Sequence, residues 1–189
     1  MRIISGLLKG KKILVPKDNK TRPLKDLTKE SIFNIIEHSN KFKIDLNNSN
    51  ILDLFSGVGS YGIECLSRGV KKVIFVENYS GVLPILKKNL LNLKLYNEYE
   101  ILENDIYGNN FFLNFDKKFD IIFLDPPFKD KNFHLLLIKI KNLKVLNKNG
   151  IIIVHRHKTE TDNFSNIFKI IEQKKYGISK VSFLSFSNE

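Results

Sequence analysis

The sequence predicts an α/β protein with a doubly wound, Rossmann-like sheet that is mostly parallel and has an antiparallel edge. From residue 50 onward, apolar runs of strand length alternate with amphipathic segments of helical length. A glycine-rich turn joins the first of these strands to a helix. The last apolar stretch, residues 180–186, alternates with polar residues, as a one-sided strand near the edge of a sheet does.

An extension precedes the alternating pattern. Two β-prone runs, residues 2–5 and 11–15, flank Gly6 and Gly10 and predict an irregular β-hairpin. Apolar side chains at helical spacing then predict a helix over residues 26–38.

The length of 189 residues suits one domain with small appendages. A polar stretch at residues 47–50 is the best candidate for a boundary. We therefore expect an N-terminal extension over residues 1–45 and a main domain over residues 46–189.

Beyond this boundary, strand and helix patterns take turns. We expect strands at residues 50–55, 71–76, 98–103, 119–124 and 150–154, and helices near residues 60–68, 80–93, 132–146 and 161–172. The first five strands are apolar enough to be covered on both faces, which is typical of a parallel sheet. In such folds the ligand chemistry lies at the carboxyl ends of the strands.

The formal net charge of +11 favours a polyanionic partner, although a compositional bias toward Lys, Asn and Ile would also raise it. Its distribution favours nucleic acid, because residues 1–25 hold eight basic side chains against one acidic residue and so supply +7 of the charge. The residues expected to face RNA are Arg2, Lys9, Lys11, Lys12, Thr21 and Arg22.

Several other classes of protein are disfavoured. No apolar run approaches the roughly 18 residues of a membrane helix, and the basic start lacks the pattern of a secretory signal, so we expect a cytoplasmic monomer. Cys65 is the single cysteine and the histidines lack zinc-ligand spacing, so we expect no disulfide and no metal. Arg156 and His157 are interpreted as exposed residues beyond the end of a strand.

The glycine-rich turn carries the first chemical signal. Gly57, Gly59 and Gly62 form a G-x-G-x-x-G pattern at the start of a helix, which lets a cofactor approach the backbone. The pattern alone fits NAD, FAD or S-adenosylmethionine. Asp53 favours S-adenosylmethionine, because a carboxylate there repels a pyrophosphate and attracts the cationic amino group of the methionine moiety.

Two further acidic residues follow the next strands. Glu77 ends the second strand, 20 residues after Gly57, where it can accept hydrogen bonds from ribose hydroxyls. Asp105 follows the third strand, where it can meet the adenine amino group while Ile106 packs on the ring. The expected cofactor-binding residues are Asp53, Phe55, Ser56, Gly57, Gly59, Glu77, Asn78, Asp105 and Ile106.

The strongest signal is Asp125-Pro126-Pro127-Phe128 at the end of the fourth strand. Two prolines stiffen the loop and fix where its carbonyl groups point. An aromatic amino group is a poor nucleophile, and two acceptors, Asp125 and the Pro126 carbonyl, can turn its lone pair toward a sulfonium methyl. Phe128 offers a face on which the base stacks. We expect Asp125, Pro126, Pro127 and Phe128 to form the catalytic loop for methylation of an exocyclic base amine.

With these motifs in place, the sequence resembles the RsmD-type bacterial methyltransferases over nearly its whole length. The matching segments are residues 2–6 with Lys9-Gly10, Thr21-Arg22-Pro23, residues 30–35, 52–59, 67–69 and 75–77, Leu124 through Phe128, and Tyr176-Gly177. The resemblance implies a class I fold with a seven-stranded sheet and a small N-terminal β-hairpin that helps hold rRNA. It also implies methylation of the N2 amino group of one guanine in 16S rRNA, on assembled or assembling small subunits.

Other functions remain open at this point. An adenine-N6 methyltransferase uses the same kind of tetrapeptide, although no target-recognition domain is visible here. A nicotinamide-dependent oxidoreductase shares the glycine pattern but is hard to reconcile with Asp53. A non-catalytic ribosome assembly factor could also retain such a pocket. The resemblance alone selects guanine over adenine.

Overall fold

The computed structural model describes residues 1–17, 24–95, 98–108, 111–127, 130, 132–162, 164 and 168–186. Its elements are α1 (Asp26–His38), η1 (Leu46–Asn48), β1 (Asn50–Leu54), α2 (Ser60–Ser67), β2 (Lys72–Val76), α3 (Leu83–Asn92), β3 (Tyr99–Leu102), η2 (Phe111–Asn114), β4 (Phe119–Leu124), α4 (Phe133–Asn142), β5 (Leu146–His157), β6 (Phe168–Tyr176) and β7 (Ser179–Phe186). Within these described ranges, no helix is both long enough and apolar enough to cross a membrane.

The strands form one seven-stranded sheet in the order β3-β2-β1-β4-β5-β7-β6. The first five strands in this order are parallel, whereas β7 runs antiparallel to β5 and β6 runs antiparallel to β7. This confirms the Rossmann-like sheet with an antiparallel edge. The chain passes outward from β1 to β3 and then returns to β4 on the other side of β1. Ligands bind beside such a reversal, at the carboxyl ends of the strands.

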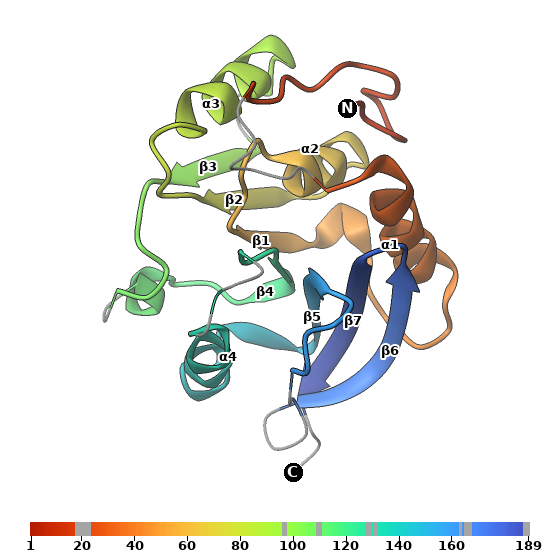
Figure 1. The fold of residues 1–189 in the computed structure, drawn as a ribbon, viewed down its shortest axis with the longest axis vertical. Coiled ribbons are helices and arrows are strands. Elements are labelled where there is room, and N and C mark those ends of the chain that lie inside the picture. The colour runs from red at the N-terminus through yellow and green to blue at the C-terminus, as the bar shows by residue number, and fades with distance from the viewer. Residues whose placement is uncertain are drawn as a thin grey trace.

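Helices cover both faces of the sheet (Figure 1). α1, α2 and α3 pack on one face, where Phe33, Tyr61 and Leu86 share a core with Phe123 of β4. α4 and η2 cover the opposite face, where Leu136 belongs to the second core. β1, β2 and β4 are therefore buried on both faces, as their apolar sequences predict, whereas β3 at the edge of the sheet is only partly buried.

The N-terminal extension is an irregular hairpin packed against the main domain. Its two arms meet in one antiparallel bridge between Arg2 and Lys12. Ile3 and Ile13 are 1% and 3% exposed and belong to the same core as α1 to α3. The hairpin runs along α2, because Leu7 N donates to Ser67 O, at the last residue of that helix. Its tip therefore lies at the end of α2 that is distant from the glycine-rich turn.

The predicted helix over residues 161–172 is wrong, because β6 occupies Phe168–Tyr176. Phe164, Phe168 and Ile171 have helical spacing, which explains the prediction. In the structure β6 pairs with β7, and a register shift between Ile170 and Glu172 interrupts the alternation that would have marked a strand.

Other elements differ from the predictions at their ends. α4 ends at Asn142 instead of residue 146, and α3 begins only at Leu83. β5 extends from Leu146 to His157, beyond the predicted residues 150–154 on both sides. Leu146 pairs with Phe119 of β4, and β7 pairs with the other end as far as His157.

Candidate active site

A cavity of about 790 Å³ opens at the carboxyl ends of β1, β2, β4 and β5. It brings together nine of the predicted site residues: Asp53, Phe55, Ser56, Gly57, Glu77, Asn78, Asp125, Pro126 and Pro127. Leu24 and Lys25 before α1, and Ile178 and Ser179 between β6 and β7, form further walls. The cofactor and acceptor signals of the sequence thus meet in one space.

The turn after β1 depends on unusual backbone conformations. Gly57 and Gly59 have φ angles of 55° and 84°, and Phe55 has a φ angle of 60°. A Cβ atom on Gly59 would lie 2.6 Å from Cδ1 of Leu86, so this glycine permits close packing of the turn on α3. A Cβ on Gly57 would meet no atom within 4 Å. Because Gly57 lines the cavity, that open space is available to a ligand.

Asp53 is a buried acid, 1% exposed, at the end of β1. Its Oδ2 accepts a hydrogen bond from Gly62 N at 3.0 Å, near the start of α2. Burial raises the pKa of Asp53 well above its usual value, the Gly62 bond opposes this rise, and the charges of Asp125 and Glu77 add to it. A cation that entered the cavity beside Asp53 would stabilise its charged form. The site therefore suits a positively charged amino group.

Glu77 is fixed by three backbone N–H groups. Its Oε2 accepts from Gly57 N at 2.7 Å, and its Oε1 accepts from Asn78 N at 2.9 Å and from Tyr79 N at 2.8 Å. A carboxylate has about four lone-pair positions, so these bonds leave about one for a ligand. Contact with both ribose hydroxyls requires the Gly57 bond to be shared or released.

Ser56 joins the first two strands of the site. Its hydroxyl donates to Asp53 O at 2.6 Å and accepts from Val76 N at 2.9 Å. The Ser56 hydroxyl thus makes its hydrogen bonds to the protein itself, and these bonds hold the turn after β1 against the end of β2.

Asp105 and Ile106 are not among the residues that line the cavity. Asp105 is exposed, and its Oδ1 accepts from Tyr107 N at 3.0 Å. Ile106 is 5% exposed and lies in the second core. The neighbouring Tyr107 does line the cavity, and its ring lies 6.2 Å from that of Phe55. Sequence reasoning named Asp105 and Ile106 but not Tyr107, the residue of this turn that lines the cavity.

Tyr107 is held by a strong hydrogen bond. Its hydroxyl donates to Asp130 Oδ2 at 2.5 Å. Burial, followed by this bond, raises the pKa of Tyr107 far above its usual value, so the phenol stays protonated at any physiological pH. Asp130 also lines the cavity, so this bond connects the turn after β3 to the loop after β4.

The loop after β4 is fixed by β5. Asp125 Oδ1 lies 2.7 Å from His155 Nδ1, and the Arg156 guanidinium donates to the Pro127 carbonyl at 3.1 Å. The prediction that residues just beyond Val154 are exposed is wrong for Arg156, which is 3% exposed. The absence of any turn residue between Val154 and Lys158 was a signal that the strand continues.

The basic residues of the extension lie on its surface. Arg2, Lys9, Lys11 and Lys12 are all exposed, and the Arg2 side chain is 71% exposed. Thr21, Arg22 and Phe128 lie outside the described residues. Among the residues that are described, no group of three or more His, Cys, Asp or Glu side chains could hold a metal ion.

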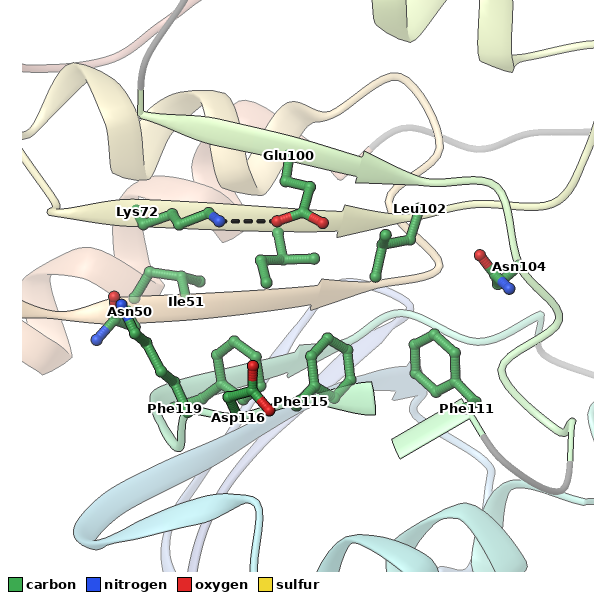
Figure 2. A pocket seen from close by; sticks show the side chains of 12 residues that line it. Asn50, Ile51, Lys72, Glu100, Leu102, Asn104, Phe111, Phe115, Asp116 and Phe119 are labelled. Carbon is green, nitrogen blue, oxygen red and sulfur yellow. Dashed lines mark hydrogen bonds and ion pairs between the residues drawn. The ribbon is translucent and has the colours of Figure 1, made fainter. Parts of the chain in front are cut away.

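A second cavity of about 350 Å³ lies on the face of the sheet next to η2. Figure 2 shows its aromatic side, formed by Phe111, Phe115 and Phe119, facing the ion pair between Lys72 of β2 and Glu100 of β3. That pair joins Lys72 Nζ to Glu100 Oε2 at 2.7 Å. None of the predicted site residues lines this space.

The seven-stranded sheet and its flanking helices form a Rossmann-like class I methyltransferase fold, and the main cavity lies at the carboxyl ends of its strands. The family model described as "conserved hypothetical protein 95" matches residues 1–185, and the chain belongs to that family.

Individual relatives and solved structures agree with this assignment. Ribosomal RNA small subunit methyltransferase D of Haemophilus influenzae is 33% identical over 195 residues, covering 100% of this chain and 94% of that protein. A solved methylase from Haemophilus influenzae has a TM-score of 0.74 at 31% identity and covers 98% of both chains. A methyltransferase from Escherichia coli superposes with a TM-score of 0.82 at 23% identity, covering 100% of this chain and 99% of the other, and supports the fold alone.

Proposed function

We propose that this chain transfers a methyl group from S-adenosylmethionine to the exocyclic N2 amino group of a guanine in 16S rRNA of the small ribosomal subunit. By family resemblance this is a guanine of the 966 type. One observation carries the proposal: Asp53 and Asp125, at the ends of neighbouring strands, open into the same cavity. In this proposal Asp53 binds the cationic amino group of the cofactor, and Asp125 orients the acceptor amine within the same cavity.

The residues of the cavity fit S-adenosylmethionine. Asp53 would hold the amino group of its methionine moiety, and Glu77 a ribose hydroxyl. The open space beside Gly57 would admit the cofactor close to the backbone, and Gly59 keeps the turn in shape. When bound, the cofactor supplies a methyl group on a positively charged sulfur. Asn78, Asp105 and Ile106 also belong to the proposed cofactor-binding residues. Asp105 and Ile106 would contribute as part of the turn that carries Tyr107.

The acceptor side uses Asp125 and the Pro126 carbonyl to accept the two N–H bonds of the base amine. None of the described residues donates a hydrogen bond to the Pro126 carbonyl, whereas Arg156 already bonds that of Pro127. These acceptors draw the amine lone pair out of conjugation, so the contribution of the loop is orientation and electrostatic stabilisation. Phe128 would stack on the base.

The relatives named as rRNA methyltransferases support rRNA as the substrate, and the net charge of +11 supports a nucleic-acid partner. The exposed Arg2 and the hairpin-tip lysines (Lys9, Lys11 and Lys12), together with Thr21 and Arg22, would contact the RNA backbone. We further propose that residues 1–45 form the rRNA-facing extension and residues 46–189 the catalytic domain of a cytoplasmic monomer.

The test is transfer of labelled methyl from S-adenosylmethionine to small subunits that lack the mark, followed by nucleoside analysis. Bare 16S rRNA and duplex DNA serve as parallel acceptors. We expect N2-methylguanosine on the subunits. Label found only as N6-methyladenine would overturn the choice of base. Binding of NADH in place of S-adenosylhomocysteine would overturn the choice of cofactor.

An Asp125→Ala variant tests whether the chain acts as an enzyme or only as an assembly factor. Because Asp125 contacts the acceptor and not the cofactor in this proposal, the variant should bind S-adenosylhomocysteine normally while losing methyl transfer. Unchanged methyl transfer in this variant would contradict the proposed mechanism.

A further inference from the structure

Asp125 directly follows β4, and His155 lies near the end of the neighbouring strand β5. β4 and β5 pair in parallel with Leu124 opposite Val154, so the next residue of each strand reaches the rim of the cavity at the same level. The contact between them is close, with 2.7 Å between Asp125 Oδ1 and His155 Nδ1. The His155 side chain is 8% exposed and that of Asp125 is 21% exposed. Both side chains thus line the main cavity, and the ring of His155 is the more buried of the two.

The next residue of β5 holds the same loop from another side. Successive side chains of a strand point to opposite faces, and the Arg156 guanidinium donates to the Pro127 carbonyl while its Nε lies 3.4 Å from Asp162 Oδ1. The Arg156 guanidinium also lies 5.1 Å from the centre of the Phe133 ring. β5 therefore fixes both the backbone of the catalytic loop and its carboxylate.

A carboxylate on its own turns freely, because the terminal torsion of Asp has a broad energy minimum. An imidazole N–H that bonds one carboxylate oxygen fixes the plane of the group and leaves the other oxygen for the substrate. Among the described residues, His155 is the one side chain that bonds Asp125. In the neutral ring, a proton on Nδ1 is the arrangement that allows this donation.

We propose that His155 is a positioning residue for methyl transfer, which holds Asp125 Oδ1 so that Oδ2 accepts the N–H of the acceptor amine. This inference rests on the proposed function, because it takes an amine as the group that Asp125 meets. During transfer the amine lone pair forms the new N–C bond as the methyl leaves sulfur, and sulfur keeps the electrons of the broken C–S bond. The nitrogen then loses one proton, which Asp125 Oδ2 accepts before it passes to solvent.

The variants that test this role differ in one hydrogen bond. His155→Leu removes the N–H donor, whereas His155→Asn places an amide N–H where Nδ1 stood. His157→Leu is the matched control, since His157 lies on the same strand and bonds Thr159 instead. We expect kcat to fall by about 10- to 100-fold in His155→Leu, as for other residues that orient a catalytic group, with an unchanged Kd for S-adenosylhomocysteine. Most of kcat should return in His155→Asn.

A second readout needs no substrate. Nitrogen NMR of the imidazole rings in the free protein should show one ring with a hydrogen-bonded proton on Nδ1, and this signal should be missing from His155→Asn. In Asp125→Ala the same ring should lose the downfield shift of its bonded proton. A ring at position 155 with its proton on Nε2 alone would overturn the inference.

The kinetic outcomes separate the two proposals. If kcat in His155→Leu stays within about twofold of the wild type, or if Asn fails to restore what Leu loses, His155 does not position Asp125 through this bond. If the wild type methylates a base amine other than guanine N2, the proposed function fails. The role of His155 is then still decided by comparing kcat of His155→Leu and His155→Asn with that amine as the acceptor.

Discussion

The carboxylate of Glu64, buried in the middle of α2, accepts the backbone N–H of Ile4 at 2.8 Å. The other oxygen of Glu64 accepts from Ser5 N at 2.9 Å, and Lys29 Nζ of α1 lies 3.5 Å from Glu64 Oε2. Both Glu64 and Lys29 are 0% exposed. One buried ion pair therefore joins the N-terminal hairpin, α1 and α2, which lie next to one another in Figure 1. The hairpin is held to the domain by this centre, by the bond from Leu7 N to Ser67 O and by the buried side chains of Ile3 and Ile13.

Substituting Glu64 with Gln should destabilise the protein by about 3–5 kcal/mol, because it leaves the Lys29 charge buried without its main partner. Burial already lowers the pKa of Lys29, and Glu64 and Asp26 oppose that change. Without Glu64 the folded pKa falls further below the unfolded value, so the loss of stability is greatest at low pH and lessens as pH rises through the folded pKa. Denaturant unfolding at several pH values measures this.

Glu37→Gln is the matched control for this prediction. Glu37 Oε1 pairs with Arg68 Nη1 at 2.7 Å, but its side chain is 32% exposed. A partly exposed pair contributes little, so we expect a change within about 1 kcal/mol. Equal losses in the two variants would mean that burial of the Glu64 pair has no special effect.

Much of the site could be predicted because its signals are local. Asp53, the glycine turn and Asp125-Pro126 lie in short segments where a strand ends, and the chain order alone places such ends at one edge of a parallel sheet. The roles of His155 and Arg156 could not be predicted in this way. The run without turn residues indicates only that the strand continues. The contacts of both residues depend on packing between segments distant in sequence, with β7 pairing along β5 and the loop after β4 bonded to His155 and Arg156.

The two glycines of the turn should respond differently to alanine. Both adopt positive φ angles, which costs alanine about 1–2 kcal/mol. Gly59→Ala adds a steric clash with the buried Leu86, so its free energy of unfolding should fall by a further 1–3 kcal/mol or so. Gly57→Ala places its methyl group in the open cavity and should mainly weaken binding of S-adenosylhomocysteine. Thermal unfolding measures the first effect and calorimetric titration the second. A lower free energy of unfolding in Gly57→Ala than in Gly59→Ala would contradict this assignment.

Asp53→Asn should make the protein more stable and less able to bind its cofactor. The folded pKa of Asp53 lies well above its unfolded value, so the folded state loses stability as pH rises from the unfolded pKa through the folded one. Asparagine removes this loss and keeps an acceptor for Gly62 N. A gain on the order of 0.5–2 kcal/mol near neutral pH is expected.

The same change predicts how cofactor affinity depends on pH. A cationic amino group prefers the ionised form of Asp53, so wild-type affinity for S-adenosylhomocysteine should rise as pH rises through the Asp53 pKa, with release of a proton on binding. Calorimetry in buffers of different ionisation enthalpy measures that proton. Binding by Asp53→Asn should be weak and should show no such proton release; tight binding by this variant would remove Asp53 from the cofactor site.

The hairpin-tip lysines should bind RNA at a distance from the target base. The tip lies at Ser67, which is roughly 10 Å along α2 from Ser60 at the cavity. Replacing the three lysines with Gln should reduce the slope of log Kd against log salt by about one per lysine, with kcat at saturating subunits unchanged. The matched control replaces three exposed lysines of the edge strand β6: Lys169, Lys174 and Lys175. Because both triple variants lose the same charge, an equal change in slope would show that net charge alone governs binding, whereas a change confined to the hairpin variant assigns the contact to that tip.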